Sequence, residues 1–323
     1  MKAALCTRYG APDVIQIVDV PKPVAADDEI LIRVRATTVT AGDWRIRSLD
    51  MPPGFGLIAR PIFGMTRPRQ PILGSEVAGE VAAVGRNVSK FHAGDRVVAF
   101  DGAGMRCHAE FKCMRASGNV VRIPDHMEFV TAAALPFGGT TAMDFLQRLG
   151  LREGERILIV GASGSVGSAA VQLARQRGAR VTGVCSSTNV EMVRSLGAER
   201  VIDYGHEDVT ALAPDFDVVM ETVGALNLTQ SMRLLRKGGR VAMIAGSLGD
   251  MLAAPWKSKL RGVKAVVGPA SEKQADLQQL VTMAGMGEFR PFIEATYPFE
   301  KIVEAHRRVQ ERRKRGNLVI TFS

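Results

Sequence analysis

The chain has few cysteines and no long apolar run, and these two shortages exclude several classes of protein. Its four cysteines are scattered and form no CxxC pair, so the sequence lacks both a disulfide framework and the usual zinc-site spacing. No apolar stretch of about eighteen residues occurs, and no membrane-spanning helix is expected. The first residues read as the start of a strand and lack the features of a signal peptide, which leads us to expect a cytoplasmic protein.

Acidic residues are outnumbered by basic ones. The chain has 33 Asp and Glu against 42 Lys and Arg, a formal net charge of +9. This excess favours contact with anions such as cofactor phosphates, anionic lipid or nucleic acid. Much of it lies at residues 307–315, which we interpret as the solvated face of a final helix, with nucleic-acid or membrane binding as the alternative.

The 323 residues suffice for two domains, and the first third is typical of a β domain. Strand-like segments at residues 30–36, 77–85, 94–100 and 109–113 are separated by turns and prolines. This pattern predicts a small β-barrel-like domain, because prolines between strands do not disturb central ladders.

From about residue 131, strands alternate with helices. A helix interrupted by Pro136 is expected over residues 131–150, followed by short apolar strands at residues 157–160, 180–185, 201–202, 217–220, 240–244 and 264–267. Such alternation predicts an α/β domain with a doubly wound parallel sheet, most simply of Rossmann topology. A further helix and the strand at residues 317–321 are expected to return to the first domain.

One of these strands is joined to a helix by a turn of small residues. Gly161, Gly164 and Gly167 follow the apolar strand at residues 157–160, and the residues after them have helical apolar spacing. Small residues let a pyrophosphate approach the backbone, and a helix N-terminus offers N–H donors and a positive dipole end. The segment therefore predicts a dinucleotide-binding site.

Several motifs, spread in order over nearly the whole chain, together resemble the medium-chain dehydrogenase/reductase superfamily, and most closely its zinc-independent quinone oxidoreductase branch. They are PILGSEVAG at residues 71–79, GDRV at 94–97, AAALP at 132–136, TTA at 140–142, the glycine-rich turn, LGA at 196–198, VIDY at 201–204, LRKGGR at 235–240 and AH at 305–306. The resemblance implies a GroES-like β-barrel catalytic domain from residues 1–125 and 288–323, and a Rossmann nucleotide-binding domain from residues 126–287. The active site is expected in the cleft between them.

Zinc-dependent members of this superfamily use a cysteine in an early loop, a histidine in a Gly-His-Glu motif, and a later cysteine or acid. Here residues 40–44 contain no cysteine, and Ser75 stands where the histidine would be. The four-cysteine structural lobe is absent too, and Asp43 with Glu76 cannot make a zinc site alone. We therefore predict a metal-independent enzyme whose acceptor is intrinsically electrophilic, such as a quinone or an enone.

The residues after the second strand of the nucleotide domain favour NADPH over NADH. An NAD enzyme usually places a carboxylate there for the ribose 2′-hydroxyl, whereas this chain has Ser186, Ser187, Thr188 and Asn189. Small hydroxyl and amide side chains suit a 2′-phosphate, which a carboxylate would repel. Arg194 lies a turn further on, either as a phosphate contact or on a solvated helix face.

The resemblance assigns further cofactor contacts. The pyrophosphate would lie on the turn, Val223 would face the nicotinamide ribose, and Thr140 or Thr141 would bond the nicotinamide side or only backbone carbonyls. Tyr204 would flank the adenosine or pack at a strand end, and Asn317 would contact a phosphate or simply open the last strand. The predicted cofactor-binding residues are Thr140, Ala162, Ser163, Gly164, Ser165, Val166, Ser186, Ser187, Asn189, Tyr204, Val223, Ala245, Gly268 and Asn317.

Residues 37–47 resemble the active-site loop of the family, which gives Thr40, Asp43 and Trp44 as predicted catalytic residues. Thr40 could donate a hydrogen bond to a substrate carbonyl. Asp43 would orient the loop, since an acid role would need a strongly raised pKa. Trp44 would line the pocket or pack in the barrel.

Two further segments leave alternatives open. Residues 51–70 form a long irregular stretch with apolar residues and three arginines, read as a lid over a hydrophobic acceptor, a packed loop, or a contact with an anionic membrane. The strand near residues 263–267 could pair across a two-fold axis, which predicts a homodimer.

The leading hypothesis is an NADPH-dependent quinone or enone reductase. The alternatives are an NADPH-binding sensor or RNA-binding protein on a reductase fold, and a zinc-free alcohol or aldehyde reductase.

Overall fold

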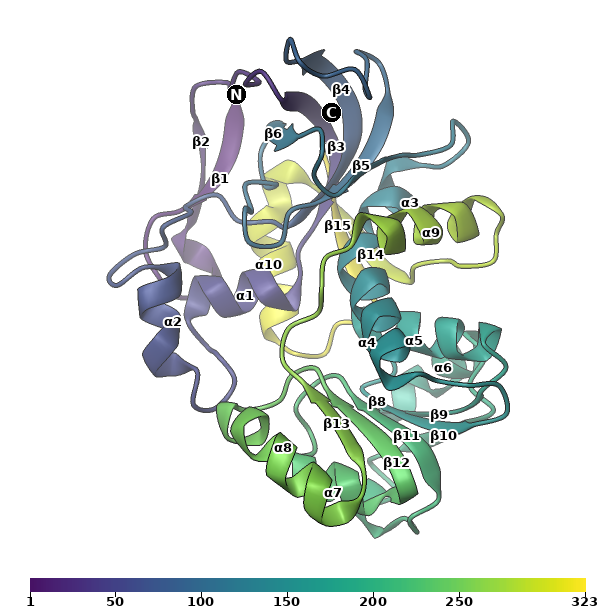
Figure 1. Ribbon diagram of the computed structural model, residues 1–323. Coiled ribbons are helices and arrows are strands. Elements are labelled where there is room, and N and C mark those ends of the chain that lie inside the picture. The colour runs from purple at the N-terminus through teal and green to yellow at the C-terminus, as the bar shows by residue number, and fades with distance from the viewer. The chain divides into compact units, whose positions relative to one another are not determined.

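The computed structural model describes the backbone of residues 1–323 and the side chains of all of them except Leu57. The chain forms two compact units. The terminal unit contains Met1–Met51, Gly56–Phe137 and Glu272–Ser323, and the central unit contains Pro52–Phe55 and Gly138–Ser271. In Figure 1 the terminal unit holds the purple, blue and yellow elements, and the central unit holds most of the teal and green ones. The domain limits expected at residues 125 and 287 stay predictions.

The central unit is built on six parallel strands. They are β8 (Arg156–Val160), β9 (Arg180–Cys185), β10 (Arg200–Asp203), β11 (Phe216–Glu221), β12 (Leu235–Met243) and β13 (Lys264–Val267). Their order across the sheet is β10-β9-β8-β11-β12-β13, which confirms the predicted doubly wound Rossmann topology. The strand order reverses between β8 and β11, and in such sheets ligands bind beyond the carboxyl ends of the strands at that point.

Helices cover both faces of this sheet, and its strands are buried between them. They are α4 (Thr141–Leu149), α5 (Ser165–Gln176), α6 (Val190–Ser195), α7 (Leu228–Arg233) and α8 (Leu248–Arg261). Since crossovers between parallel strands are right-handed, α5 and α6 lie on one face and α7 and α8 on the other (Figure 1). The short helices η3 (Ser187–Asn189) and η4 (Val209–Ala211) follow β9 and β10.

The terminal unit contains a largely antiparallel sheet that both ends of the chain share. Its strands are β3 (Glu29–Thr38), β4 (Glu76–Val84), β5 (Arg96–Phe100), β6 (Phe111–Arg115), β7 (Val120–Arg122), β14 (Ile293–Pro298) and β15 (Asn317–Thr321). The order is β14-β15-β3-β4-β5-β7, with β6 paired to β3. Strand β15 pairs antiparallel with β3, so the predicted return of the last strand to the first domain is confirmed.

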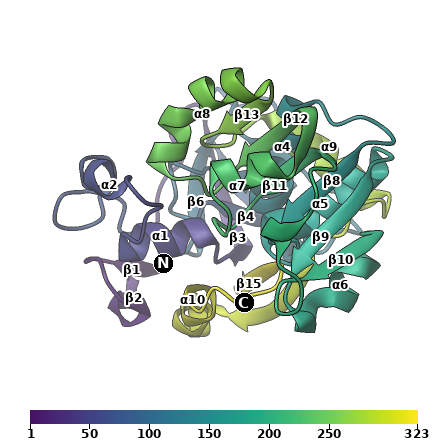
Figure 2. The same ribbon diagram turned by 90° about the horizontal axis from the view of Figure 1, so that it is seen from below.

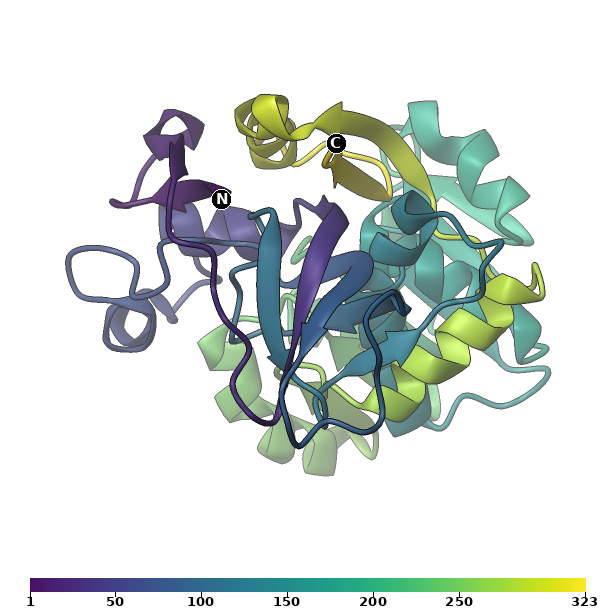
Figure 3. The ribbon, with the colours of Figure 1, turned by 90° about the horizontal axis from the view of Figure 1, so that it is seen from above.

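Short elements complete the terminal unit, seen from above in Figure 3. They are the hairpin of β1 (Lys2–Cys6) and β2 (Ile15–Asp19) with η1 (Pro12–Val14), the helices α1 (Ala41–Ser48), α2 (Gly56–Phe63), α3 (Phe129–Ala133), α9 (Gln274–Gly285) and α10 (Ile302–Gln310), and η5 (Phe299–Lys301). The π-helix η2 (Pro136–Thr140) joins this unit to α4. Within the described chain, no helix combines the length and apolarity needed to cross a bilayer.

Three helices lie where the sequence predicts none. The first is α1, which is held by a capping box between Thr40 and Asp43. Prolines inside α2 and α8 (Pro61 and Pro255) weaken their sequence signals, because proline removes a helix hydrogen bond. Strand β12 begins at Leu235, earlier than the strand expected at residues 240–244, because Leu235 pairs with Phe216 of β11.

Candidate functional site

The turn after β8 brings the backbone close to two neighbouring elements. Gly161 has a φ of 81°, and a Cβ atom there would lie 2.5 Å from Cγ1 of Val223. The N–H groups of Gly161 and Ala162 both donate to the carbonyl oxygen of Val184, at 3.1 and 2.9 Å. At Gly167, a Cβ would lie 2.1 Å from the oxygen of Gly161. Glycine is therefore required at both ends of the turn.

Gly164 lies in open space at the N-cap of α5. Its φ of −78° and ψ of 176° are extended, and the nearest atom to a built Cβ is the Gly161 oxygen at 3.6 Å. The first N–H groups of a helix have no partner inside the helix, and the dipole is positive at that end. The open backbone before Ser165 and Val166 is therefore a cradle that an anionic phosphate fits.

A cluster of hydroxyl and amide groups lies beside this cradle, at the end of β9. The amide nitrogen of buried Asn189 is 3.2 Å from Ser163 Oγ and 3.0 Å from Ser186 Oγ, and it donates to both. Ser186 also lies within hydrogen-bonding distance of Thr188, with 3.2 Å between the two hydroxyl oxygens. Parallel pairing of β8 with β9 thus brings three predicted cofactor-binding residues together.

Ser187 has a neighbour that the sequence did not reveal. It hydrogen-bonds Asp203, and this bond and the N–H of Gly205 lower the pKa of that carboxyl. Asp203 ends β10, and only the β9–β10 pairing brings it next to the residues after β9. The Asp203 carboxylate therefore lies near the hydroxyl and amide cluster, and it accepts a hydrogen bond from Ser187.

A cavity of about 440 Å³ opens at the carboxyl ends of the central strands, in the central unit. Tyr204 and Val223, both exposed, line it, as do Gly161, Val184 and Leu226. His206, Glu207 and Asp208 also line it. The apolar part of the wall, with the Tyr204 ring, suits a flat heterocycle. The structure thus places two predicted cofactor contacts on one cavity next to the turn.

Buried Glu221 fixes the position of Val223. Its carboxylate accepts N–H bonds from Val223 at 3.1 Å, Gly224 at 2.8 Å and Ala225 at 3.0 Å. Burial raises the pKa of Glu221, although these bonds act in the opposite direction. No local sequence pattern indicates this role for Glu221, because the role depends on the path of the turn after β11.

The remaining predicted cofactor contacts are spread over both units. Thr140 is buried and precedes α4, while Ala245 and Gly268 follow the ends of β12 and β13. Asn317 lies in the terminal unit, where its amide donates to the Phe292 carbonyl at 3.0 Å as β15 begins. Asn317 therefore has the contacts of a residue that opens a strand.

Thr40 and Asp43 are joined in the capping box that begins α1. Asp43 Oδ2 accepts from the Thr40 N–H at 2.8 Å and from its hydroxyl at 2.7 Å. Asp43 Oδ1 accepts from the Gly74 N–H at 2.8 Å. Both carboxylate oxygens of Asp43 thus hold α1 against the segment before β4. These contacts orient the loop that begins α1.

Trp44 packs in the core of the terminal unit. It is 5% exposed and belongs to an apolar cluster with Ile302, Ala305 and Val309 of α10. The Arg312 guanidinium lies 4.7 Å from its ring centroid. These contacts are those of a packing residue.

Glu76 is fully buried at the start of β4. The Thr38 hydroxyl donates to one carboxylate oxygen, and the Phe137 N–H donates to the other at 2.6 Å. Burial raises the pKa of Glu76 to about 8, and burial lowers the pKa of Lys314, which feels the charge of Glu76, to about 8. Sequence reasoning named Glu76 only as a possible ligand and missed Lys314.

Buried histidines lie in the same unit. His306 is fully buried, its ring centroid is 5.5 Å from that of His108, and neither ring nitrogen has a hydrogen-bond partner among the described residues. Burial, and then the charges of His108 and Arg47, hold the pKa of His306 well below its usual value. His306 is therefore neutral in the folded protein at neutral pH.

We predict that His306 makes the protein sensitive to acid. The unfolded chain takes up a proton near pH 6.5 and the folded chain does not, so stability present above that pH falls as the pH drops below it. The expected loss is about 1.4 kcal/mol per pH unit. His306→Leu should remove this slope in urea unfolding at several pH values, whereas His126→Leu, at an exposed site, should keep it. Equal slopes in all three proteins would contradict the prediction.

Potential metal ligands are dispersed. No group of three His, Cys, Asp or Glu side chains that could hold a metal ion occurs among the described residues. Ser75 is buried beside Glu76, and the oxygens of Asp43 and Glu76 already accept hydrogen bonds from the protein.

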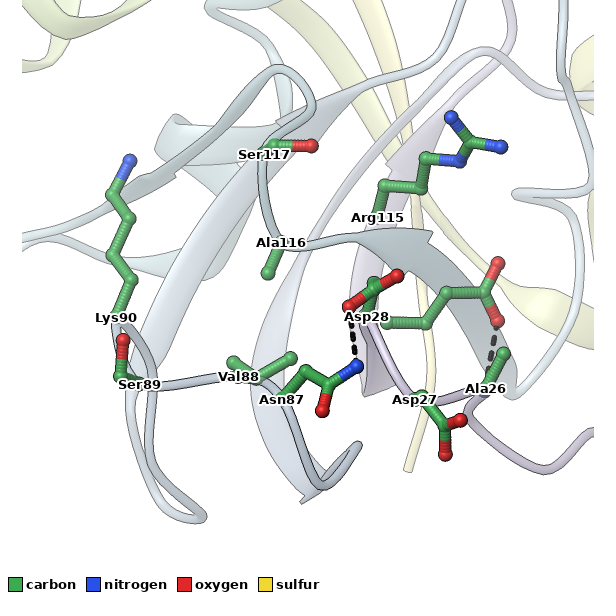
Figure 4. Close-up of a pocket in the computed structure, with 11 residues that line it drawn as sticks. Ala26, Asp27, Asp28, Asn87, Val88, Ser89, Lys90, Arg115, Ala116 and Ser117 are labelled. Atoms are coloured by element: carbon green, nitrogen blue, oxygen red, sulfur yellow. Dashed lines mark hydrogen bonds between the residues drawn. The ribbon is translucent and has the colours of Figure 1, made fainter.

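The terminal unit also has a hollow of about 690 Å³ at the ends of its strands (Figure 4). Two of its acids have partners: Asp27 pairs with Arg86 at 2.6 Å, and Asp28 accepts from the Asn87 amide at 3.0 Å. None of the residues predicted to bind substrate or cofactor lines it.

Comparison with known families matches two parts of the chain. Residues 26–142 match the alcohol dehydrogenase GroES-like domain, and residues 196–320 match a domain described as zinc-binding dehydrogenase. The second match does not include the early loop or Ser75, where the superfamily's catalytic zinc ligands would stand.

Individual proteins match over nearly the full chain. The quinone oxidoreductase of Sus scrofa is 33% identical, with 95% of this chain and 93% of the relative covered. The acryloyl-coenzyme A reductase of Metallosphaera sedula is 28% identical, with 99% and 100% covered. Among solved structures, the quinone oxidoreductase of Coxiella burnetii superimposes with a TM-score of 0.88 at 27% identity, with 99% of both chains covered.

Proposed function

Because the chain belongs to the medium-chain dehydrogenase/reductase superfamily and is an oxidoreductase, we propose that it transfers hydride from NADPH to a quinone or an enone without a metal ion. The observation that carries the proposal is the pairing of an open helix N-terminus at Gly164 with the hydroxyl and amide cluster of Ser163, Ser186 and Asn189. The helix N-terminus would bind the pyrophosphate, and the hydroxyl and amide cluster would bind the 2′-phosphate.

The central unit would hold the dinucleotide at the carboxyl ends of β8, β9 and β11. The N-terminus of α5 would bind the pyrophosphate, the cavity beside Tyr204 would take the adenosine, and Val223, fixed by Glu221, would contact the nicotinamide ribose. Thr140, Ala245 and Gly268 would line the nicotinamide side. Asn317 would add little to phosphate binding, since its amide is used within its own unit.

The preference for NADPH follows from the charge at the end of β9. No carboxylate occurs among residues 186–190, and Asp203 is already hydrogen-bonded to Ser187. Ser186 and Thr188 present hydroxyl groups, which can donate to phosphate oxygens. A carboxylate that binds the 2′-hydroxyl of NADH is missing from the position where it usually stands.

Reduced nicotinamide supplies a hydride, and the protein's part is to orient the acceptor and exclude water. Thr40 and Asp43 would set the backbone of the acceptor-side loop through the capping box, with Trp44 anchoring α1 in the core. Quinones and enones accept hydride without a Lewis acid, which agrees with Ser75 and with hydrogen bonds that already engage Asp43 and Glu76. The names of the quinone and acryloyl-coenzyme A reductases support both acceptor classes.

The proposal is tested by oxidation of NADPH and of NADH with a panel of quinones, enones and aldehydes, with and without chelator. We expect turnover of quinones or enones that favours NADPH and is indifferent to chelator. Tight NADPH binding with no turnover of any acceptor would indicate a sensor, and turnover of aldehydes alone would indicate a different reductase.

Asp43→Asn is expected to lower kcat/KM at least tenfold with little change in NADPH affinity. Asp43 accepts three donors, and an amide NH₂ would face one of them, a loss of about 1–3 kcal/mol in stability. The matched control is Asp13→Asn, which removes an exposed partner of Arg307 in the same unit. Equal activity of the two variants would refute an orienting role for Asp43.

We also propose a homodimer and keep a cytoplasmic location as part of the proposal. Strand β13 is the last in its sheet, and α8 beside it exposes Leu252, Trp256 and Leu260, which recur at every fourth residue. An unpaired edge next to an apolar stripe favours pairing with a second copy.

Light scattering should show a dimer, and Trp256→Gln should shift it toward monomer. A monomeric natural protein would refute this part of the proposal.

A further inference from the structure

Helix α2 and the turn after it expose apolar and cationic side chains together. Ile58 is 42% exposed, Ile62 57% and Met65 61%, and the two isoleucines are four residues apart on one helix face. In the terminal unit, α2 and its turn lie at the edge, beside α1 (Figure 2). We call this the α2 surface, which consists of Ile58, Arg60, Ile62, Met65, Arg67 and Arg69.

The charge of this segment is of one sign. Residues 51–75 contain three arginines and no lysine, aspartate or glutamate. All three arginines are exposed. No acid within the segment can therefore neutralise them, and the surface presents a positive charge to any partner.

The segment is held in place by its own hydrogen bonds and by the β1–β2 hairpin loop. Tyr9 donates from its hydroxyl to the Gly64 carbonyl at 2.7 Å, and Arg60 donates to the Met65 carbonyl at 2.6 Å. The Arg69 N–H donates to the Phe63 carbonyl at 2.7 Å. Ala59 of α2 is buried. The exposed apolar side chains are therefore carried by a hydrogen-bonded helix and turn.

We propose that the α2 surface binds an anionic phospholipid membrane. Apolar side chains at the headgroup boundary and arginines on lipid phosphates are the combination that interfacial helices use. The inference rests on the proposed function in one respect: a lipophilic quinone resides in the bilayer, so attachment there would bring the enzyme to its acceptor.

Two other occupants fit the surface less well. A second copy paired through the same surface would bring three arginines against three arginines, with no acid in the segment to offset the repulsion. A lid over the acceptor would turn its apolar side chains inward and its arginines outward, whereas here both kinds are exposed together. A membrane accommodates both kinds at once.

The test is co-sedimentation with vesicles of phosphatidylcholine, with and without phosphatidylglycerol. We expect the protein to pellet only with the anionic vesicles at about 50 mM salt and to be released at about 500 mM salt, because screening weakens surface charge. The apolar triple variant I58Q/I62Q/M65Q should bind at least tenfold more weakly. The double variant V24Q/M286Q, which removes exposed apolar side chains elsewhere in the unit, should bind normally.

The arginines require a control for net charge. R60Q/R67Q/R69Q and R152Q/R180Q/R233Q remove the same charge from exposed positions, and only the first set should release the protein from anionic vesicles. Equal loss of vesicle binding in both sets of variants would show that the overall charge of the protein, and not the α2 surface, causes the binding. Failure of the natural protein to pellet, or normal binding by the apolar triple variant, would overturn the proposal.

Three further readouts separate the alternatives. A change in molecular mass in the apolar triple variant, without vesicle binding by the natural protein, would show that a second copy covers the surface. Protection of residues 56–70 from protease by NADPH alone would show a lid. Turnover of a water-soluble quinone without vesicle binding would overturn this inference and leave the proposed function intact. Vesicle binding without turnover of any acceptor would support membrane binding and contradict the proposed function.

Discussion

Gly164→Asp is expected to weaken NADPH binding at least about 100-fold while leaving the protein as stable as before. Gly164 is the N-cap of α5 in an extended conformation, and a Cβ atom there would meet no atom closer than 3.6 Å. Aspartate is among the best N-cap residues, because its carboxylate accepts N–H bonds from the first helical turn. Those N–H groups are the ones a pyrophosphate would need, and the added charge would repel it.

The measurement is the dissociation constant for NADPH by fluorescence titration, together with the midpoint of thermal unfolding. Gly164→Ser is the matched control, since serine also caps a helix but carries no charge. It should lose much less affinity than the aspartate variant. Undiminished binding by the aspartate variant would place the pyrophosphate elsewhere.

Ser186→Asp is expected to invert the cofactor preference. It places a carboxylate at the end of β9, beside Ser163 and Asn189. The carboxylate would repel the 2′-phosphate of NADPH and accept hydrogen bonds from the 2′- and 3′-hydroxyls of NADH. We expect kcat/KM to fall about 100-fold with NADPH and to change less than about threefold with NADH.

The control for this variant is Ser195→Asp, which adds the same charge to an exposed residue on α6. It should leave the ratio of the two kcat/KM values unchanged. If Ser186→Asp lowers both values equally, the residues after β9 do not read the 2′-phosphate.

Local signals were sufficient for the Rossmann sheet and its glycine-rich turn. Short apolar strands, and glycines at positions where a Cβ would clash, carry that information in adjacent residues, as at Gly161 and Gly167. The predicted Rossmann topology is consistent with the pairing of β8 with β9, and this pairing brings Ser163 and Ser186 to the same side-chain amide of Asn189.

Contacts between segments that are distant in the sequence could not be predicted from local signals. Glu221 holds Val223 only through the path of one turn, and Asp203 meets Ser187 only because β10 pairs with β9. Burial of His306 beside His108 requires α10 to pack within its unit. Helix α8 was also not predicted, because Pro255 interrupts its sequence signal.

The central claim is hydride transfer from NADPH to an electrophilic acceptor without a metal ion. Its most direct test follows a deuterium label from the nicotinamide of NADPH into the β-carbon of an enone. The protein would first be dialysed against a chelator and its metal content measured. We predict one labelled product per NADPH oxidised at an unchanged rate. Loss of label transfer after dialysis, restored by added zinc, would contradict the account.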